Sequence, residues 1–192
     1  MFRFLILGLL RHGLPLHGFA LLKQYRDRSG LKTNTGNFYR EMPRLVAEGL
    51  VRYVPNPTEA DDRRIPYEIT DAGRAAFDAW LSDPGDSGSG GSEDEMSTRA
   101  LFLGDAAPEI VSSILDHWKD ELLYQAKGIE RERRAALVQS QQRATERFVA
   151  RPVLLSRRLK RVAADLEFLE EFRLAYEEWR QPPRKAPTRR RS

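Results

Sequence analysis

A stretch of glycine, serine and acidic residues divides the sequence into two parts. Residues 84–95 are Pro-Gly-Asp-Ser-Gly-Ser-Gly-Gly-Ser-Glu-Asp-Glu. This composition is typical of a flexible linker, because it offers no apolar side chain to a core. We therefore expect two folded domains, at 1–83 and 96–180, and a basic tail at 181–192 that we predict to be disordered. The tail either touches nucleic acid non-specifically or is simply solvated.

The spacing of apolar residues predicts three helices at the start of the first part. They cover about residues 2–11, 16–28 and 34–48. Gly30 is a natural C-cap for the second helix, and Gly49 ends the third. The order is thus helix, short turn, helix, followed by a further amphipathic helix. In the second helix we place these apolar side chains in the core: Phe19, Leu21, Leu22 and Tyr25.

Pro43 lies well inside the third predicted helix. A proline in a regular helix interior removes a backbone hydrogen bond, at a cost of about 3 kcal/mol. We expect the helix either to begin late or to kink near Phe38 and Tyr39. The helix is still predicted because these apolar residues keep helical spacing: Phe38, Met42, Leu45 and Val46.

Two short strands are predicted after the third helix, at 50–55 and 64–69. The polar, turn-rich segment between them makes the pair a hairpin, or wing, and a fourth helix follows. Arg63 and Arg64 stand at the base of the wing, within reach of phosphates or the minor groove. The alternative is a solvated hairpin with local ion pairs.

The outer side of the third helix carries short polar and basic side chains. Such side chains suit a DNA major groove, where base edges and phosphates are both in reach. Asn37 is the best candidate for a base contact, because a carboxamide pairs with adenine through two hydrogen bonds. Tyr39 can also pack its ring on the core, so that only the hydroxyl reaches a phosphate. An amphipathic helix with a solvated face is the alternative. The predicted DNA-binding residues are Lys32, Thr35, Asn37, Tyr39, Arg40, Arg44, Arg63 and Arg64.

Two long helices are predicted in the second part, after a short helical piece at about 95–103. They cover about 108–147 and 153–180. In the last helix, apolar residues recur in steps of three and four, which approximates a heptad seam. Two such helices either pack on each other or find a partner chain, and a homodimer is the simplest solution. The predicted dimerisation residues are Leu155, Leu159, Val162, Leu166, Leu169, Phe172 and Tyr176.

Composition excludes several classes of protein. The net charge of +4 and pI of about 9.5 are compatible with nucleic-acid binding without establishing it. The absence of cysteine excludes disulfides and Cys-ligated zinc and fits a cytoplasmic protein. His12, His17 and His117 lack metal-ligand spacing, and the glycine cluster at 85–91 is not a phosphate-binding loop. We therefore expect no enzyme, no cofactor and no metal. No stretch approaches the roughly 18 apolar residues of a membrane span.

Five blocks of the first part resemble PadR-type transcriptional regulators, in the family's order and spacing. They are LILGLL at 5–10, LHGFALL at 16–22, TGNFY at 35–39, LVAEGLV at 45–51 and YEITDAG at 67–73. The resemblance implies a mainly α fold, with a winged helix-turn-helix followed by a domain of long helices that forms a dimer. It also implies a bacterial regulator, usually a repressor. Several members of that family release DNA on binding small, often aromatic, molecules. The second part resembles the family only in its layout.

The leading hypothesis is a dimeric regulator of double-stranded DNA. Its third helices enter the major groove at two half-sites of a pseudo-palindrome, roughly 34 Å apart. A second hypothesis, compatible with the first, is a ligand sensor with its ligand between the two domains or at the dimer interface. The predicted lining of that pocket is Trp80, Phe102, Trp118 and Trp179, although aromatic residues at helical spacing usually form core. The remaining alternative is a winged helix that serves as a protein-interaction module, or a sensor without specific DNA binding.

Overall fold

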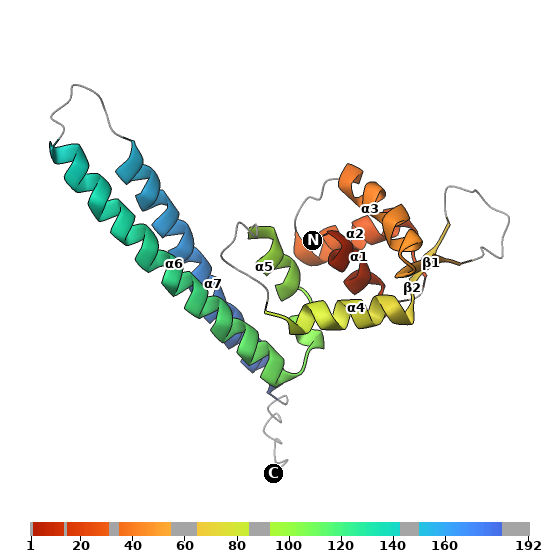
Figure 1. Ribbon diagram of the computed structural model, residues 1–192. Helices are drawn as coiled ribbons and strands as arrows, with labels where there is room; N and C mark the ends of the chain where they lie inside the picture. The colour runs from red at the N-terminus through yellow and green to blue at the C-terminus, as the bar shows by residue number, and fades with distance from the viewer. Residues whose placement is uncertain are drawn as a thin grey trace, which may run out of the picture. The chain divides into compact units, whose positions relative to one another are not determined.

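The computed structural model describes residues 2–13, 15–30, 35–54, 65–84, 93–142 and 150–181. The chain forms two compact units, residues 1–114 and 115–192, and the boundary falls inside the long helix α6 (Pro108–Gln142). The described residues form helices and one two-stranded antiparallel sheet, which lies at the edge of the N-terminal unit (Figure 1). The predicted class, mainly α with a two-stranded wing, is confirmed.

Helix α1 (Phe2–Leu10) is the centre of the N-terminal unit. It contacts α2 (Gly18–Ser29), α3 (Thr35–Ala47), α4 (Asp71–Ser82) and strand β2 (Tyr67–Ile69). All six residues at 5–10 are buried, as expected of a helix that is apolar on every side. Gly8 permits this packing, because a Cβ there would lie 2.6 Å from the ring of Phe102.

Helix α2 ends at Gly30, whose φ of 67° and left-handed conformation confirm the predicted cap. The inward placement of Phe19 is wrong, because this side chain is 68% exposed. Successive helical residues are about 100° apart, so Phe19 points away from the face that Gly18, Leu22 and Tyr25 bury. Gly18, and not the larger phenylalanine, takes the buried position at the start of the helix.

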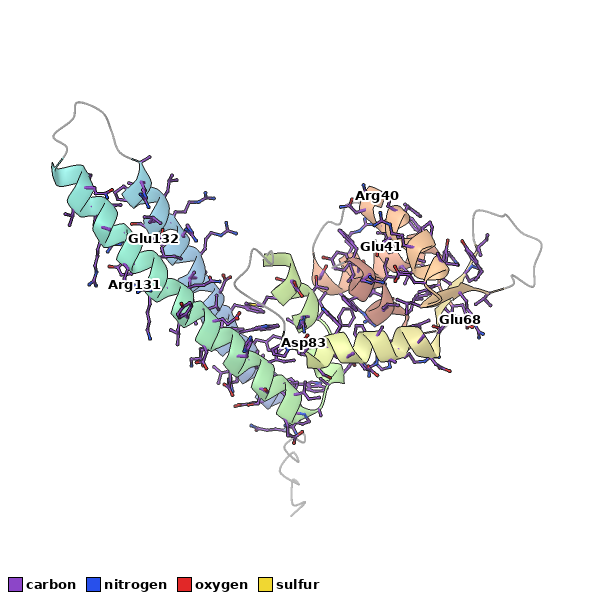
Figure 2. The ribbon with its side chains drawn as sticks, viewed as in Figure 1. Arg40, Glu41, Glu68, Asp83, Arg131 and Glu132 are labelled. Atoms are coloured by element: carbon purple, nitrogen blue, oxygen red, sulfur yellow. The ribbon has the colours of Figure 1, made fainter. Side chains whose placement is uncertain are left out.

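Helix α3 begins at Thr35 and continues through Pro43 to Ala47. The predicted late start is therefore wrong. The buried residues Phe38, Met42 and Leu45 share its inner face, which confirms the predicted core side. Figure 2 shows Arg40 and Glu41 on this helix.

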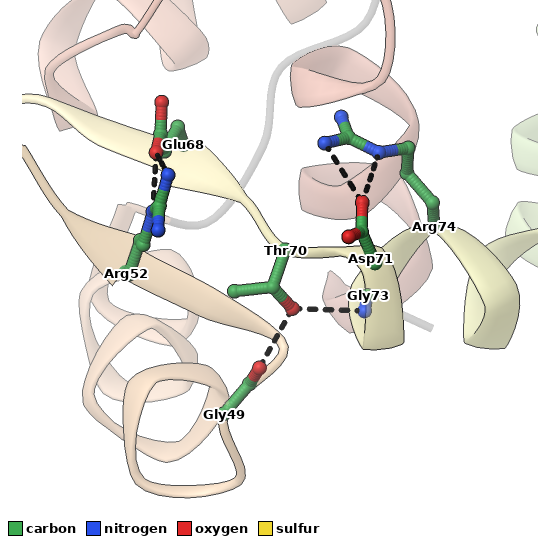
Figure 3. A network of polar contacts seen from close by, with 7 residues as sticks. All are labelled: Gly49, Arg52, Glu68, Thr70, Asp71, Gly73 and Arg74. Atoms are coloured by element: carbon green, nitrogen blue, oxygen red, sulfur yellow. Dashed lines mark hydrogen bonds and ion pairs between the residues drawn. The ribbon is translucent and has the colours of Figure 1, made fainter.

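Short contacts at Gly49, Thr70 and Gly73 join the end of α3 to the start of α4. Gly49 ends the helix with a φ of 71°, and its N–H donates to the Val46 carbonyl. The Thr70 hydroxyl donates to the Gly49 carbonyl at 2.7 Å and accepts from the Gly73 N–H at 3.1 Å (Figure 3). A Cβ at Gly73 would lie 2.1 Å from the carbonyl oxygen of Leu50, so only glycine fits there. This junction fixes α3, the wing and α4 relative to one another.

The wing consists of β1 (Val51–Tyr53) and β2, which are antiparallel and shorter than the predicted strands. Val51 pairs with Ile69 at the core end, and Tyr53 pairs with Tyr67 further out. Tyr67 also exchanges both backbone hydrogen bonds with Leu16, at 2.9 and 3.0 Å. The wing is thereby joined to the segment that precedes α2. The predicted wing tip lies outside the described residues.

The buried side chain of Arg99 joins α5 (Glu93–Ala100) to the end of α4. Arg99 is 2% exposed and donates to the backbone carbonyls of Trp80, at 2.6 Å, and Asp83. It also forms an ion pair with Glu95 at 3.1 Å. Its guanidinium lies over the Trp80 ring, 4.5 Å from the centroid. Helix α5 begins within the range predicted as linker, and a 3-10 turn, η2 (Leu103–Asp105), follows it.

In the C-terminal unit, α6 and α7 (Arg151–Arg180) run antiparallel, side by side (Figure 1). Lys119 meets Glu170, and Asp116 meets Arg173, each pair at 2.6 Å. Helix α7 begins two residues before the predicted start at 153, because Arg151 and Pro152 form its first turn. The buried positions recur every seven residues in both helices: Leu115, Leu122, Ile129 and Ala136 in α6, and Leu155, Val162 and Leu169 in α7.

Within the described ranges, no helix is both long enough and apolar enough to cross a membrane. Most of the predicted basic tail, residues 182–192, lies outside those ranges.

Candidate DNA-binding surface

One side of α3 is open to solvent along its whole length. The exposed positions follow steps of three and four, so they lie on one face, opposite Phe38, Met42 and Leu45. They include four of the residues predicted to bind DNA: Thr35, Tyr39, Arg40 and Arg44. The amphipathic division predicted for this helix is therefore present, and its outer face is polar and basic.

Asn37 and Arg40 are joined on this face. The Arg40 guanidinium donates a hydrogen bond to the side-chain oxygen of Asn37, three residues earlier. Asn37 is half-buried, whereas Arg40 is exposed. The bond holds the guanidinium next to the carboxamide that we predicted to read a base. The carboxamide oxygen of Asn37 has a second lone pair, so it can accept from adenine while Arg40 stays bound or turns to a neighbouring phosphate.

Arg44 follows Arg40 by one helical turn and pairs with Glu41 at 3.6 Å. The Arg44 side chain is largely exposed, whereas that of Glu41 is mostly covered. An exposed ion pair of this kind contributes about 0–1 kcal/mol, so Arg44 can exchange Glu41 for a phosphate at little cost. Glu41 reduces the positive charge of the surface.

The Tyr39 side chain packs partly against the protein and is partly exposed to solvent. Its ring meets the ring of Phe38 edge-on, with centroids 5.6 Å apart. A Cβ on Gly18 would lie 3.1 Å from the Tyr39 ring, so this glycine gives the ring room beside α2. The side chain still remains 52% exposed. Part of the ring therefore packs against the protein, and the rest faces solvent.

The described part of the wing adds little positive charge to this surface. Arg52 on β1 forms an ion pair with Glu68, its cross-strand partner on β2 (Figure 3). The predicted phosphate contacts Lys32, Arg63 and Arg64 lie outside the described residues. They stay predictions.

Helix α2 contributes residues that sequence reasoning missed. Phe19 is exposed near its start, and Lys23, Arg26 and Arg28 are exposed along it. Gly18, Leu21, Leu22 and Tyr25 share one face of the helix. If Gly18 is counted as a core position, this spacing places Phe19 outside.

The aromatic residues predicted to line a ligand pocket divide between the two units. In the N-terminal unit, Trp80 stacks on Phe4 with ring centroids 4.7 Å apart and also touches Phe77. Phe102 is buried and meets Phe77 edge-on at 5.3 Å. In the C-terminal unit, Trp118 is buried, whereas Trp179 is 67% exposed near the end of α7. Trp80 and Phe102 are thus brought together through Phe77.

The residues predicted for dimerisation lie along α7 in two groups. Leu155, Val162 and Leu169 are buried within the single chain. The other four are half-buried: Leu159, Leu166, Phe172 and Tyr176. Nearby, a groove is lined by Leu159 and by residues of α6 that include Tyr124, Lys127 and Glu130.

Among the residues that the structure describes, no group of three or more His, Asp or Glu side chains is placed to hold a metal ion.

Comparison with known proteins places the N-terminal unit in a family. Residues 6–79 match the model of the transcriptional regulator PadR-like family. The chain is similar to Bacillus subtilis PadR in complex with operator DNA, with 18% identity and a TM-score of 0.41 over 88% of this chain and 94% of that one. It is also similar to the PadR-like regulator BC1756 from Bacillus cereus, with 17% identity and a TM-score of 0.37 over 93% of this chain and 99% of that one. A third similar structure is B. subtilis PadR with p-coumaric acid, with 17% identity and a TM-score of 0.37 over 91% of this chain and 94% of that one.

No curated protein sequence matches the chain. The family match covers most of α1 to α4 together with the wing, which are the elements that form and support the exposed face of α3. Residues 6–79 of this chain therefore match the domain of the transcriptional regulator PadR-like family.

Proposed function

We propose that this chain is a transcriptional repressor that binds a pseudo-palindromic operator as a homodimer. The exposed face of α3, with Tyr39, Arg40 and Arg44 beside the wing, is the observation that carries the proposal. A helix of this kind fits the major groove, where Asn37 contacts a base and the two arginines contact base edges or phosphates. Helix α3 is held by the junction at Gly49, Thr70 and Gly73, so it enters the groove as part of a rigid unit.

The C-terminal unit supports the proposal of a homodimer. Large apolar side chains remain exposed on both of its helices: Tyr124 and Val138 on α6, and Val153, Leu154 and Leu174 on α7. A second copy of the same helices would cover them and would complete the burial of the half-buried seam on α7. Two linked copies of α3 then address two half-sites about one helical turn of DNA apart.

The test begins with selection of DNA from a random pool by the purified full-length chain. The enriched duplex is labelled, and its affinity is measured by fluorescence anisotropy between about 50 and 200 mM salt. We expect an enriched motif with two-fold symmetry, and a steep fall of affinity with salt because released counterions drive the binding.

The variant Asn37→Ala with Arg40→Ala tests the face of α3. We expect at least a 30-fold loss of affinity for the selected duplex, since about 1–3 kcal/mol is lost for each good base contact. Arg131→Ala is the matched control, because it removes an exposed arginine from α6 (Figure 2). Equal affinity of the double variant and the wild type, or binding that ignores salt, would exclude the proposal. A chain that enriches no DNA would favour the protein-interaction module instead.

We further propose that a small aromatic effector releases the DNA. The fluorescence of Trp80 should report such binding, because this side chain is half-buried and is in contact with Phe4, Phe77 and Arg99. The experiment records tryptophan fluorescence and DNA affinity across a panel of aromatic acids that includes p-coumaric acid. A compound that weakens DNA binding and changes the emission supports the proposal. Unchanged fluorescence and affinity across the panel would contradict it.

A further inference from the structure

Three tyrosine side chains from three different elements lie close together at the edge of the DNA-binding surface. They are Tyr39 on α3, Tyr53 on β1 and Tyr67 on β2. Tyr53 and Tyr67 are cross-strand partners, and their ring centroids are 5.2 Å apart. Side chains alternate along a strand, so these two rings share one face of the wing, and Arg52 and Glu68 lie on the other.

The segment before α2 connects this pair to Tyr39. Leu16 pairs with the backbone of Tyr67, and two residues later Gly18 lies against the Tyr39 ring. At Gly18, a Cβ would be 3.1 Å from the ring and 3.6 Å from the hydroxyl oxygen of Tyr39. The glycine therefore places the phenol of Tyr39 at the start of α2, close to the pair on the wing.

Two of these three phenols are accessible to solvent. Tyr39 is 52% exposed and Tyr53 is 49% exposed, whereas Tyr67 is half-buried. Burial raises the pKa of Tyr67, and the nearby hydroxyls of Tyr53 and Tyr39 raise that pKa further. The Tyr67 hydroxyl is therefore neutral near pH 7 and keeps its proton to donate.

We propose that Tyr39, Tyr53 and Tyr67 form a neutral phosphate-binding site that holds the DNA backbone between the recognition helix α3 and the wing. Their hydroxyls donate hydrogen bonds to phosphodiester oxygens, and their rings cover the adjoining sugars. The position follows from the proposed function: a duplex with α3 in its major groove brings a backbone strand to the base of the wing. This inference rests on the proposed DNA binding and specifies how the backbone is held.

A neutral donor differs from a cation in one measurable respect. A lysine or arginine that neutralises a phosphate releases counterions. Each such contact makes the fall of log affinity with log salt steeper by about 0.9. A tyrosine hydroxyl adds affinity without neutralising charge, so the salt slope stays the same when it is removed. The site should therefore strengthen binding at every salt concentration by the same factor.

The experiment replaces each tyrosine by phenylalanine in the full-length chain, which removes only the hydroxyl. Affinities for the selected duplex are measured by fluorescence anisotropy over a series of salt concentrations. We expect Tyr53→Phe and Tyr67→Phe each to weaken binding by about 3- to 10-fold, the usual effect of one hydrogen bond. Tyr39→Phe should act similarly, and all three should leave the salt slope unchanged. Arg40→Gln should instead lower the slope by about one.

Tyr25→Phe is the matched control, because it removes the hydroxyl of a tyrosine that lies on the buried face of α2. Thermal unfolding checks that each variant keeps the wild-type fold. If the wild type binds the selected duplex and Tyr53→Phe and Tyr67→Phe bind it equally well, the tyrosine site is wrong and the proposed function stands. If the wild type binds no DNA, the proposed function itself fails. A change of salt slope in the phenylalanine variants would also contradict neutral phosphate binding.

Discussion

The two units of this protein treat their apolar side chains differently. Among the described residues of the N-terminal unit, the large apolar side chains that stay exposed are Phe19, Tyr39, Tyr53 and Ile65, which lie on α2, α3, β1 or just before β2. In the C-terminal unit, exposed apolar side chains are spread over both long helices, from Leu123 and Tyr124 on α6 to Leu174 and Trp179 on α7. The N-terminal unit thus buries its core within one chain, whereas the C-terminal unit leaves large apolar side chains exposed along both helices.

The two units differ in how many elements pack against each helix. The N-terminal unit surrounds α1 with other elements, so every residue at 5–10 is buried. Its elements pack so closely that a Cβ has no room at Gly8, against the rings of Phe77 and Phe102, or at Gly73, against the backbone of Leu50. The described part of the C-terminal unit has two helices only, and each can bury just the stripe that faces the other. We infer that the first unit is stable alone and that the second depends on association. The predictions below test each half of this statement.

The largest effect is expected from Gly73→Val. A Cβ at this position would lie 2.1 Å from the Leu50 carbonyl oxygen, and backbone on both sides has to separate. We expect a loss of more than about 3 kcal/mol in the free energy of unfolding of the N-terminal unit. Hydrogen exchange of the α4 amides measures it. Gly104→Ala is the control, since nothing lies within 4 Å of a Cβ there, and its exchange should match the wild type. Unchanged protection in Gly73→Val would show that the unit is less tightly closed than we infer.

The next effect is expected from Arg99→Met. The substitution keeps an unbranched side chain but leaves the carbonyls of Trp80 and Asp83 without the buried guanidinium. A hydrogen bond from a charged group contributes about 1.5–3 kcal/mol, so we expect a total loss of about 3 kcal/mol, with a change in the emission of Trp80. Urea unfolding followed by fluorescence measures both. Arg26→Met, at an exposed position on α2, is the control. If Arg99→Met were as stable as this control, the link between α4 and α5 would contribute nothing to the closed core.

The dependence of the C-terminal unit on a partner is tested by Val138→Glu with Leu154→Glu. Both side chains are more than half exposed in the single chain, so the variant should keep its helix content. If a second copy covers them, two buried charges should weaken the dimer by about 2 kcal/mol, or roughly 30-fold. Sedimentation equilibrium distinguishes the 22.1 kDa chain from its dimer. Gln139→Glu adds a charge at a neighbouring exposed position and serves as the control. A dimer that survives the double change uses another surface, such as the half-buried seam on α7.

The sequence predicted the N-terminal unit well because its rules are local. The glycine caps at Gly30 and Gly49 are each sufficient to end a helix. The errors came where a tertiary contact decides. Phe19 was placed inside because its hydrophobicity was counted and the burial of Gly18 was not. Pro43 was expected to delay the helix or to kink it, yet α3 begins at Thr35 and its inner face packs on α1.

The sequence predicted the part of the candidate site that lies on one face of α3, and not the contacts between elements. Helical spacing identified the exposed positions of α3, but not the bond between Arg40 and Asn37. The tyrosine site escaped notice because its members come from three elements, separated in sequence and joined through strand register and Gly18. Spacing within one element cannot show such a site.

The smallest effect concerns the surface charges of α6, where exposed ion pairs should add little to either unit. Arg133 and Arg134 donate hydrogen bonds to Glu130, at 2.8 and 3.0 Å, and lower the pKa of this carboxyl from 4.5 to about 2. Because the folded-state pKa is depressed, the stabilisation is fully present above pH 4.5 and is lost as the pH falls towards 2. A carbon-detected NMR titration of the Glu130 carboxyl should give the low pKa, and Glu130→Gln should remove that part of the pH dependence of helix content. Titration of Glu130 near its ordinary value would show that these arginines are free to contact a partner, and the polar surface of α6 would then join its apolar residues as part of the interface.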